Sequence, residues 1–173
     1  MERRTRNALN AQPKSAMVIQ VASLDEARTL HNEFDVVISA GVRPSEVRWD
    51  HPAHIVRTFH DGLTGQGRAT LEAIAALLAF GNGRPGSTLV HCHRGESRST
   101  AVAIGLMVQA GATPSEAVQQ LKAQHPADRA FTPNALVLSH VEAVLGMDHL
   151  VKDIARHAPT SGALLPLATS RLW

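Results

Sequence analysis

The sequence contains one cysteine, Cys92, and the residues around it form a pattern capable of nucleophilic chemistry. Cys92 follows a short apolar stretch typical of a buried strand, Thr88 to His91, and Arg98 stands six positions later, where a helical pattern begins. A strand, a short loop and a helix N-terminus bind anions, because successive backbone N–H groups turn inward and the helix dipole adds positive potential. The same surroundings favour thiolate over thiol. The spacing therefore predicts a nucleophilic cysteine beside a site for a phosphate-sized anion.

The residues that follow Cys92 support this interpretation over a purely structural one. Arg98 can hold two phosphate oxygens through its planar fork, a geometry that lysine does not supply, and Gly95 permits a tight path of the loop. A lone cysteine after a strand is most often a small buried hydrophobe. The combination of glycine at +3, arginine at +6 and the hydroxyl of Ser99 at +7 disfavours that role.

The histidines around Cys92 raise the possibility of a metal site at this position. His91, Cys92 and His93 are consecutive, and His51 and His54 add two more imidazoles upstream. Neighbouring residues of a strand point to opposite faces of the sheet, and no second cysteine completes a common zinc set. We therefore expect neither a metal nor a cofactor.

The whole segment resembles the signature of a known superfamily. The fixed positions of the pattern HCxxGxSRS are all present, as His91, Cys92, Gly95, Ser97, Arg98 and Ser99. The segment resembles the cysteine-dependent protein tyrosine phosphatases in their dual-specificity form, of the small bacterial type. The similarity extends loosely over residues 17–145, including the start of a late helix at Pro133-Asn134.

The resemblance implies a role for each residue of the segment. Cys92 attacks phosphorus, Arg98 binds the phosphoryl oxygens, and the Ser99 hydroxyl stabilises the thiolate when it leaves. His91 braces the loop. The phosphate-binding residues are the consecutive six, His93, Arg94, Gly95, Glu96, Ser97 and Arg98. Glu96 departs from expectation, because an acid inside this loop weakens affinity for highly charged substrates.

The implied mechanism also needs a general acid, since an alkoxide or phenolate leaves poorly unless it is protonated. The superfamily uses an aspartate on a mobile loop upstream of the cysteine. Asp61 lies 31 positions before Cys92, directly after a strand pattern and ahead of three glycines. Asp50, at 42 positions, is the competing candidate and is further than the family spacing. The structural alternative for Asp61 is a turn residue before Gly62.

For four further side chains the sequence leaves open whether they contact the substrate. Arg94 either contacts substrate at the rim of the site or is solvated. Trp49, Phe59 and Phe131 could line the site against an aromatic ring, but for Phe59 a core position is the expectation.

Strand and helix patterns alternate along the chain before helices alone follow. Strand patterns cover residues 17–21, 35–40, 55–59 and 88–91, and helical patterns cover 23–31, 68–80, 99–110, a segment from 113, 132–145 and 149–157. This order predicts an α/β domain with a central, mostly parallel sheet of four or five strands and helices on both faces. The resemblance implies the same protein tyrosine phosphatase-like fold.

Length and composition suit one globular domain. The chain has 173 residues, of which 44% are hydrophobic and 18% charged, so it is not disordered throughout. We expect a flexible basic N-terminal arm at 1–15, a catalytic domain at 16–157 and a C-terminal arm at 158–173. No apolar run is long enough to span a bilayer, and no apolar stretch follows the charged start, so we expect a cytoplasmic protein without a membrane partner.

The charge distribution argues against nucleic acid as a partner. The first fifteen residues, with four basic side chains against one acidic one, carry a net charge of +3, which exceeds the formal net charge of +2 of the whole chain. The rest of the chain is close to neutral, which does not provide a broad basic face. The expected partner is instead a phosphorylated protein or a small phosphomonoester.

These observations lead to one function and two alternatives. The first is a phosphomonoester hydrolase, a protein tyrosine or dual-specificity phosphatase acting through a cysteinyl-phosphate intermediate. The second is a rhodanese-type sulfurtransferase, which places its loop arginine one residue earlier than Arg98. The third is a catalytically silent phosphate-binding module, but such modules lose the cysteine, the arginine or the acid, and this chain keeps all three.

Overall fold

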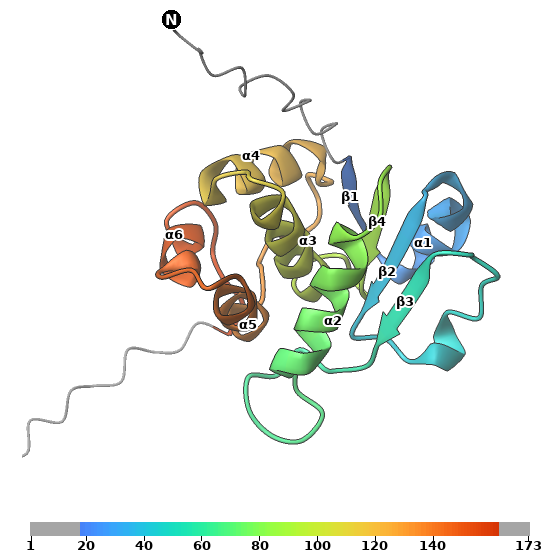
Figure 1. Ribbon diagram of the computed structural model, residues 1–173, viewed down its shortest axis with the longest axis horizontal. Helices are drawn as coiled ribbons and strands as arrows, with labels where there is room; N and C mark the ends of the chain where they lie inside the picture. The colour runs from blue at the N-terminus through green and yellow to red at the C-terminus, as the bar shows by residue number, and fades with distance from the viewer. Residues whose placement is uncertain (1–17, 163–173) are drawn as a thin grey trace, which may run out of the picture.

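The computed structural model describes residues 18–162, which form a parallel sheet with helices on both sides (Figure 1). Within these residues, four strands pair in the order β1-β4-β2-β3, and every neighbouring pair is parallel. The strands are β1 (Ile19–Ala22), β2 (Val36–Ala40), β3 (His54–Arg57) and β4 (Thr88–His91). The expected α/β fold with a mostly parallel sheet of four or five strands is thereby confirmed, with four.

The helices divide unequally between the two faces of the sheet. The α-helices are α1 (Leu24–Leu30), α2 (Leu71–Asn82), α3 (Arg98–Gln109), α4 (Pro114–Gln124), α5 (Ala135–Leu145) and α6 (Leu150–Ala155). Two short 3₁₀ helices, η1 (His31–Glu33) and η2 (Pro44–Glu46), follow α1 and β2. In Figure 1, α1 lies on one side of the sheet, whereas α2 and α3 cover the other side with α4, α5 and α6 behind them.

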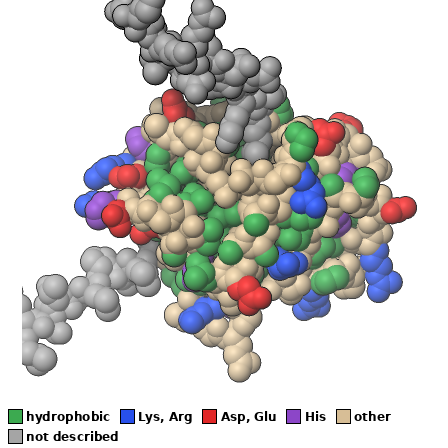
Figure 2. Space-filling view, viewed as in Figure 1, with side chains coloured by type: hydrophobic (Ala, Val, Ile, Leu, Met, Phe, Trp, Pro, Cys, Tyr) green, Lys and Arg blue, Asp and Glu red, His purple; other side chains and the backbone are tan. Residues whose placement is uncertain are grey.

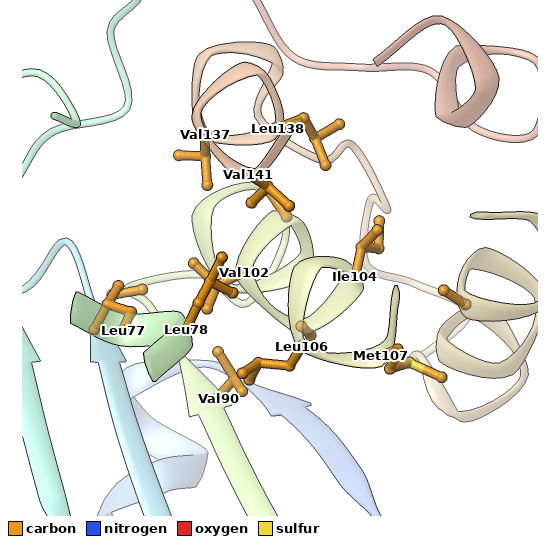
Figure 3. Packing of buried hydrophobic residues seen from close by; sticks show 14 of the residues in the cluster. Leu77, Leu78, Val90, Val102, Ile104, Leu106, Met107, Val137, Leu138 and Val141 are labelled. Atoms are coloured by element: carbon orange, nitrogen blue, oxygen red, sulfur yellow. The ribbon is translucent and has the colours of Figure 1, made fainter. Parts of the chain in front are cut away.

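Alternating strand residues supply the cores on the two faces. Val36 and Ile38 of β2 and Val90 of β4 belong to the large cluster with α2, α3 and α5, part of which is drawn in Figure 3. Val37 and Leu89, their neighbours along the same strands, pack instead with α1. Successive side chains of a strand point to opposite faces. Every residue of β2 is buried, Ser39 as well as the four apolar ones, so both faces of the sheet must be covered.

Helix starts follow from side-chain caps that the sequence already displays. Ser23 and Thr113 each accept a hydrogen bond from the backbone N–H of a glutamate three residues later, and that glutamate bonds back to the cap. Asn134 caps α5 by accepting from the backbone N–H of Val137. Such caps satisfy backbone donors that a helix start otherwise leaves unpaired.

The segment after α6 returns to the body of the protein. Ala158 is buried in the large core, and Ser161 pairs with Asn134 as an isolated parallel bridge. The first residues of the expected C-terminal arm thus pack on the domain, because an apolar side chain and a backbone pairing hold them there. The N-terminal arm at 1–15 and the rest of the C-terminal arm lie outside the described residues.

Figure 2 shows acidic and basic side chains interspersed over the described part of one face, without a broad basic area there. In the same part of the chain, none of the helices is both long enough and apolar enough to cross a membrane.

Candidate active site

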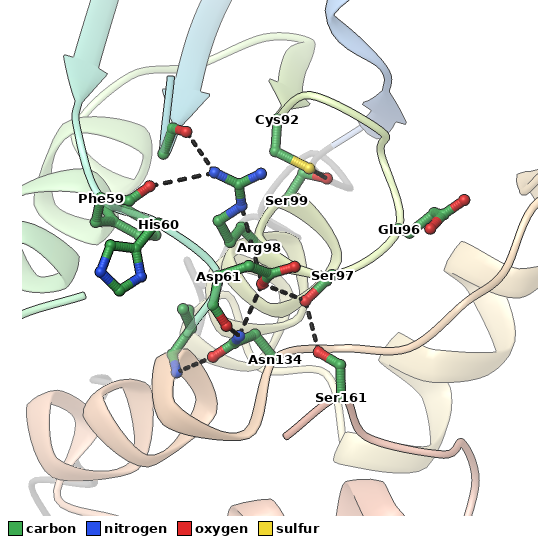
Figure 4. A network of polar contacts seen from close by, with 12 residues as sticks. Phe59, His60, Asp61, Cys92, Glu96, Ser97, Arg98, Ser99, Asn134 and Ser161 are labelled. Atoms are coloured by element: carbon green, nitrogen blue, oxygen red, sulfur yellow. Dashed lines mark hydrogen bonds and ion pairs between the residues drawn. The ribbon is translucent and has the colours of Figure 1, made fainter. Parts of the chain in front are cut away.

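The candidate residues meet at one edge of the sheet because the strands are parallel. Gly41 follows β2, Asp61 follows β3 after a short extension, and Cys92 follows β4. The carboxyl ends of parallel strands lie at a common edge, where open α/β sheets bind their ligands. Figure 4 shows Asp61, Cys92 and Arg98 gathered at this edge. Asp50 precedes the amino end of β3, so the topology brings Asp61, and not Asp50, to the cysteine.

The thiol of Cys92 lies beneath the loop 92–98 with two polar neighbours. Its Sγ accepts a hydrogen bond from the backbone N–H of Gly95 at 3.2 Å and lies 3.1 Å from the Ser99 hydroxyl oxygen. The side chain is buried. Both neighbours can donate to a thiolate, which is the arrangement that the sequence predicted for Ser99.

Three backbone contacts, from two other segments, hold the loop 92–98 in place. The N–H of Leu24 donates to the carbonyl of His93, and the N–H groups of Thr132 and Asn134 donate to the carbonyls of Glu96 and Ser97. Every one of these contacts occupies a loop carbonyl, not a loop N–H. These contacts therefore use none of the loop N–H groups, of which that of Gly95 donates to Cys92 Sγ.

Gly95 is required by its surroundings as well as by its backbone conformation. Its φ is +73°, and an added Cβ would stand 2.8 Å from the carbonyl carbon of Ala22. The loop thus packs directly on the end of β1, which a side chain at this position would prevent.

Arg98, the first residue of α3, is hydrogen-bonded through Nη1 but not through Nε. Its Nη1 donates to the backbone carbonyls of Gly41 and of Phe59, the latter at 3.2 Å (Figure 4). Its Nε is buried and has no hydrogen-bond partner among the described residues. Burying an unpaired donor costs about 1–3 kcal/mol. Because Nε and Nη2 share one edge of the guanidinium plane, an oxyanion with two oxygens would satisfy both.

Gly41 is a site residue that the sequence did not identify; it directly follows the strand pattern 35–40. Its φ is +76°, and an added Cβ would lie 2.6 Å from both Arg98 Nη1 and the Phe59 carbonyl oxygen. Glycine is therefore needed for the arginine to reach its two carbonyl acceptors. A glycine directly after a strand pattern was the only signal available.

Asp61 lies beside Arg98 and is held by its own network. Its Oδ1 accepts hydrogen bonds from Ser97 Oγ at 2.7 Å and from Asn134 Nδ2 at 2.8 Å, and it lies 3.9 Å from Arg98 Nε. Asn134 also donates to the backbone carbonyl of Asp61 at 2.9 Å. Both donors and the guanidinium approach the same carboxylate oxygen, which leaves Oδ2 for other partners.

Two residues of this network, Asn134 and Ser161, were not predicted as site residues. The sequence identified Asn134 as the start of a helix, and it performs that role as well: its Oδ1 caps α5 while its Nδ2 holds Asp61. Ser161 contacts the Ser97 hydroxyl at 2.6 Å from a segment without any sequence pattern.

His91 connects the loop to a polar chain inside the sheet. Burial lowers the pKa of His91 to about 4, so its ring is neutral at pH 7. Its Nδ1 lies 3.5 Å from the Cys92 carbonyl, which can only accept, so Nδ1 carries the proton. Its Nε2 then accepts from the Ser39 hydroxyl at 2.5 Å, and that hydroxyl accepts from His54 Nε2 at 2.7 Å.

His54 is the outer end of this chain, and it was weighed in the sequence only as a metal ligand. Burial, followed by the charge of His51, lowers the pKa of His54 to about 4. Trp49 covers the chain, with its ring centroid 5.5 Å from that of His54 and 5.1 Å from that of His91.

The remaining side chains of the loop point outward and pair with acids. Arg94 is 79% exposed and lies 3.2 Å from Glu96, and His93 lies 3.6 Å from Glu46 on η2. The backbone N–H of Arg43 is the main cause of a lowered pKa at Glu46. Both basic side chains on the outer surface of the loop, His93 and Arg94, thus have an acidic neighbour.

The three aromatic residues weighed as a wall of the site have different positions. Phe59 is a core residue, as expected, and contributes its backbone carbonyl to Arg98. Trp49 packs on the α1 face, stacked with His31 at 4.7 Å. Phe131 is half-buried and stands edge-on to His125.

Comparison with known proteins identifies the fold. No family model matches the sequence, and no curated protein matches it either. Among solved structures, human DUSP28 is 19% identical with a TM-score of 0.55, over 73% of this chain and 90% of that chain. A mouse putative dual specificity phosphatase complexed with zinc tungstate is 19% identical with a TM-score of 0.51, over 81% and 92%. PTPMT1 in complex with PI(5)P is 13% identical with a TM-score of 0.50, over 82% and 95%. The chain therefore has the fold of the dual-specificity phosphatases.

Proposed function

We propose that this protein is a phosphomonoester hydrolase that acts through a cysteinyl-phosphate intermediate, with protein phosphotyrosine or a related phosphorylated residue as substrate. The observation that carries the proposal is Arg98, whose Nη1 is fixed by two carbonyls. Its buried Nε makes no hydrogen bond with the described residues and lies 3.9 Å from Asp61 Oδ1. A phosphoryl group fits this free edge, because it offers two oxygens in the plane of the fork.

The first chemical step forms the bond from Cys92 Sγ to phosphorus and breaks the bond from phosphorus to the ester oxygen. Arg98 and the loop N–H groups hold the phosphoryl oxygens as charge develops on them. Asp61 gives its proton to the leaving oxygen. With Oδ1 occupied by Ser97 and Asn134, Oδ2 is the oxygen that carries this proton.

The second step returns the enzyme to its starting state. A water attacks phosphorus, Asp61 takes up the proton of that water, and the bond from phosphorus to sulfur breaks. Cys92 leaves as thiolate, with hydrogen bonds from the Gly95 N–H and the Ser99 hydroxyl within 3.2 Å of Sγ. Inorganic phosphate is then released.

The outer surface of the loop supports a substrate of low charge. Arg94 and His93, the two basic side chains beside Arg98, each have a glutamate within 3.6 Å. A polyphosphorylated ligand would have to compete with Glu46 and Glu96 for contacts with His93 and Arg94. We therefore place a singly phosphorylated protein or small phosphomonoester ahead of inositol polyphosphates, and the cytoplasm, where a thiol stays reduced, as the compartment.

The proposal is tested by turnover of 4-nitrophenyl phosphate and of phosphotyrosine and phosphoserine peptides by the full chain. We expect hydrolysis, and acid quenching should isolate a phosphorylated protein. Cys92→Ser should abolish both, because a serine hydroxyl is hardly ionised at neutral pH. It should retain the binding of tungstate, a tetrahedral oxyanion, since the arginine and the N–H groups remain.

Two outcomes would contradict the proposal. Sulfur transfer from thiosulfate to cyanide without phosphate release would indicate the sulfurtransferase alternative. Tungstate binding by the unaltered chain, without turnover of any aryl phosphate, would indicate a silent phosphate-binding module.

A further inference from the structure

The segment that follows α6 runs back to the active site. The backbone N–H of Ser161 donates to the carbonyl of Pro133 at 3.1 Å, and the carbonyl of Ser161 accepts from the N–H of Ala135 at 3.0 Å. These two bonds lie on either side of Asn134, the residue that holds Asp61. Ser161 is thus attached by its main chain to the part of the molecule that positions the acid.

The side chain of Ser161 points at the same network (Figure 4). Its Oγ lies 2.6 Å from Ser97 Oγ, and Ser97 Oγ donates its single proton to Asp61 Oδ1 at 2.7 Å. A hydroxyl has one proton, so Ser97 accepts in its contact with Ser161. The donors therefore form one directed chain, from Ser161 through Ser97 to the carboxylate of Asp61.

This chain fixes the rotation of a side chain that would otherwise turn freely. The Asp61 side chain is 47% exposed, while Ser97 is buried. Ser97 and Asn134 both donate to Oδ1 and none of the described donors is assigned to Oδ2. Hydrogen-bonded chains of this kind strengthen each member, because every donor polarises the next.

Gly162, the next residue, touches the loop that carries the acid. A Cβ added to it would stand 2.6 Å from the Leu63 side chain, two residues after Asp61, and its φ is +69°. The segment therefore packs against the acid-bearing loop as well as bonding to Ser97. Two independent contacts link residues 161 and 162 to the position of Asp61.

We propose that Ser161 is a positioning residue for Asp61 that acts through Ser97, so the segment after α6 is part of the catalytic apparatus. This inference rests on the proposed function, in which Asp61 is the general acid. Ser161 does not touch the reacting atoms. Its effect is confined to steps in which Asp61 gives or takes a proton.

The test is Ser161→Ala, assayed with aryl phosphates whose phenols leave easily and with those whose phenols leave poorly. Loss of one neutral hydrogen bond should reduce kcat about fivefold for poor leaving groups, with little change for good ones, which need no proton. Ser161→Thr keeps the hydroxyl and should restore the rate. Ser139→Ala is the matched control, because Ser139 is exposed on α5 and its hydroxyl donates to the carbonyl of Leu136 in the same helix.

A double-mutant cycle separates positioning from a general structural effect. In an Asp61→Asn background, Ser161→Ala should cause no further loss, because there is no proton left to position. Gly162→Ala provides a second approach. The added methyl group should displace Leu63, and the rate should again fall more for poor leaving groups than for good ones. Adding Leu63→Ala to this variant should partly restore the rate.

Three results would overturn the inference while leaving the proposed function intact. They are an unchanged rate in Ser161→Ala, an equal loss for both classes of leaving group, and a full additional loss in the Asp61→Asn background. Failure of the proposed function itself would appear in the unaltered chain, as absence of aryl phosphate turnover. Thermal melts of all variants identify any that fail to fold, and Ser161→Thr then carries the test.

Discussion

At the scale of single residues, the proposed phosphate-binding arginine and the proposed general acid differ in burial. Arg98 is only 11% exposed on its side chain, whereas that of Asp61 is 47% exposed. The burial of Arg98 suits a fixed binding fork, and the exposure of Asp61 suits a group that exchanges protons with water between the two steps.

Replacing Asp61 by asparagine tests the proton-transfer role. The amide keeps an acceptor for Ser97 and Asn134 but has no proton to give, so kcat for poor leaving groups should fall on the order of 10²-fold. The fall of rate at high pH should also disappear, because no carboxyl remains to deprotonate. Steady-state kinetics across pH with two aryl phosphates measures both effects.

Asp50→Asn is the matched control for this variant. Asp50 is exposed and lies before the amino end of β3, away from the edge at which Cys92 stands. Its replacement should leave both the rate and the pH profile unchanged. A larger defect in Asp50→Asn than in Asp61→Asn would assign the acid to Asp50.

Residues whose chemistry is local could be predicted from the sequence, and those placed by tertiary contacts could not. Cys92, Arg98 and Ser99 fall within eight consecutive residues, and their contacts follow from a strand, a loop and a helix start. Ser161 meets Ser97 across 64 positions, and Ser39 meets His91 across 52. No periodicity or spacing identifies pairs of that kind.

At the scale of elements, the predicted bounds agree best with the structure where the sequence contains residues that begin or end a helix or strand. β4 covers Thr88–His91 as expected, and α4 begins at the Pro114 that follows its capping threonine. The strand expected at 55–59 is instead His54–Arg57. Its last two residues leave the sheet because Thr58 donates to the carbonyl of Val42 and Phe59 turns into the core.

The turn after β2 is the element on which the position of Arg98 depends. Gly41→Ala should move the guanidinium, because a Cβ would stand 2.6 Å from Nη1. A displacement of about 1 Å in a catalytic group costs on the order of 10²-fold in rate. We therefore expect kcat/KM for aryl phosphates to fall by that factor and tungstate binding to weaken.

Gly111→Ala is the control that separates this contact from backbone strain. Gly111 also has a positive φ, +108°, but its added Cβ meets nothing within 4 Å. Both variants should lose stability by about 1–3 kcal/mol for the strained backbone, while only Gly41→Ala should lose activity. Equal activity losses in the two variants would contradict the role given to Gly41.

At the scale of the whole molecule, the two faces of the sheet support different parts of the site. The large core behind β4 fixes α3 and hence the start of the helix at Arg98. The α1 face carries the chain of His54, Ser39 and His91, under Trp49. The site therefore depends on packing of both layers, although its own residues lie at one edge.

An ion pair connects α1, on one face of the sheet, with the segment before α5, on the other. Arg129, before α5, forms two hydrogen bonds of 2.8 Å with the carboxylate of Glu26 on α1. This pairing, with the hydrogen bonds from Ser23, lowers the pKa of Glu26 to about 2. The folded state thus holds Glu26 ionised below its ordinary pKa of 4.5, and the stability from this contact is lost as pH falls from 4.5 towards 2.

The buried imidazole of His91 predicts an earlier loss of stability in acid. Burial, with the charges of His54, His93 and His31, lowers its pKa from 6.5 to about 4, partly offset by the Cys92 carbonyl. Between these two pH values His91 is protonated in the unfolded chain but neutral in the folded protein, so the free energy of unfolding falls as pH drops from 6.5 to 4. The shift corresponds to about 3 kcal/mol for this group at full effect.

Urea unfolding at pH values from 7.5 to about 4.5 measures this dependence, together with an NMR titration of the His91 ring. We expect the free energy of unfolding to decrease steadily below pH 6.5 and the ring to stay neutral at pH 5. His157→Gln, at an exposed position, should keep the slope, whereas His91→Asn should reduce it. A flat profile, or a His91 ring that is protonated at pH 6, would show that burial does not hold the imidazole neutral. A protonated ring donates from both nitrogens, so the Ser39 hydroxyl could not then donate to His91 Nε2.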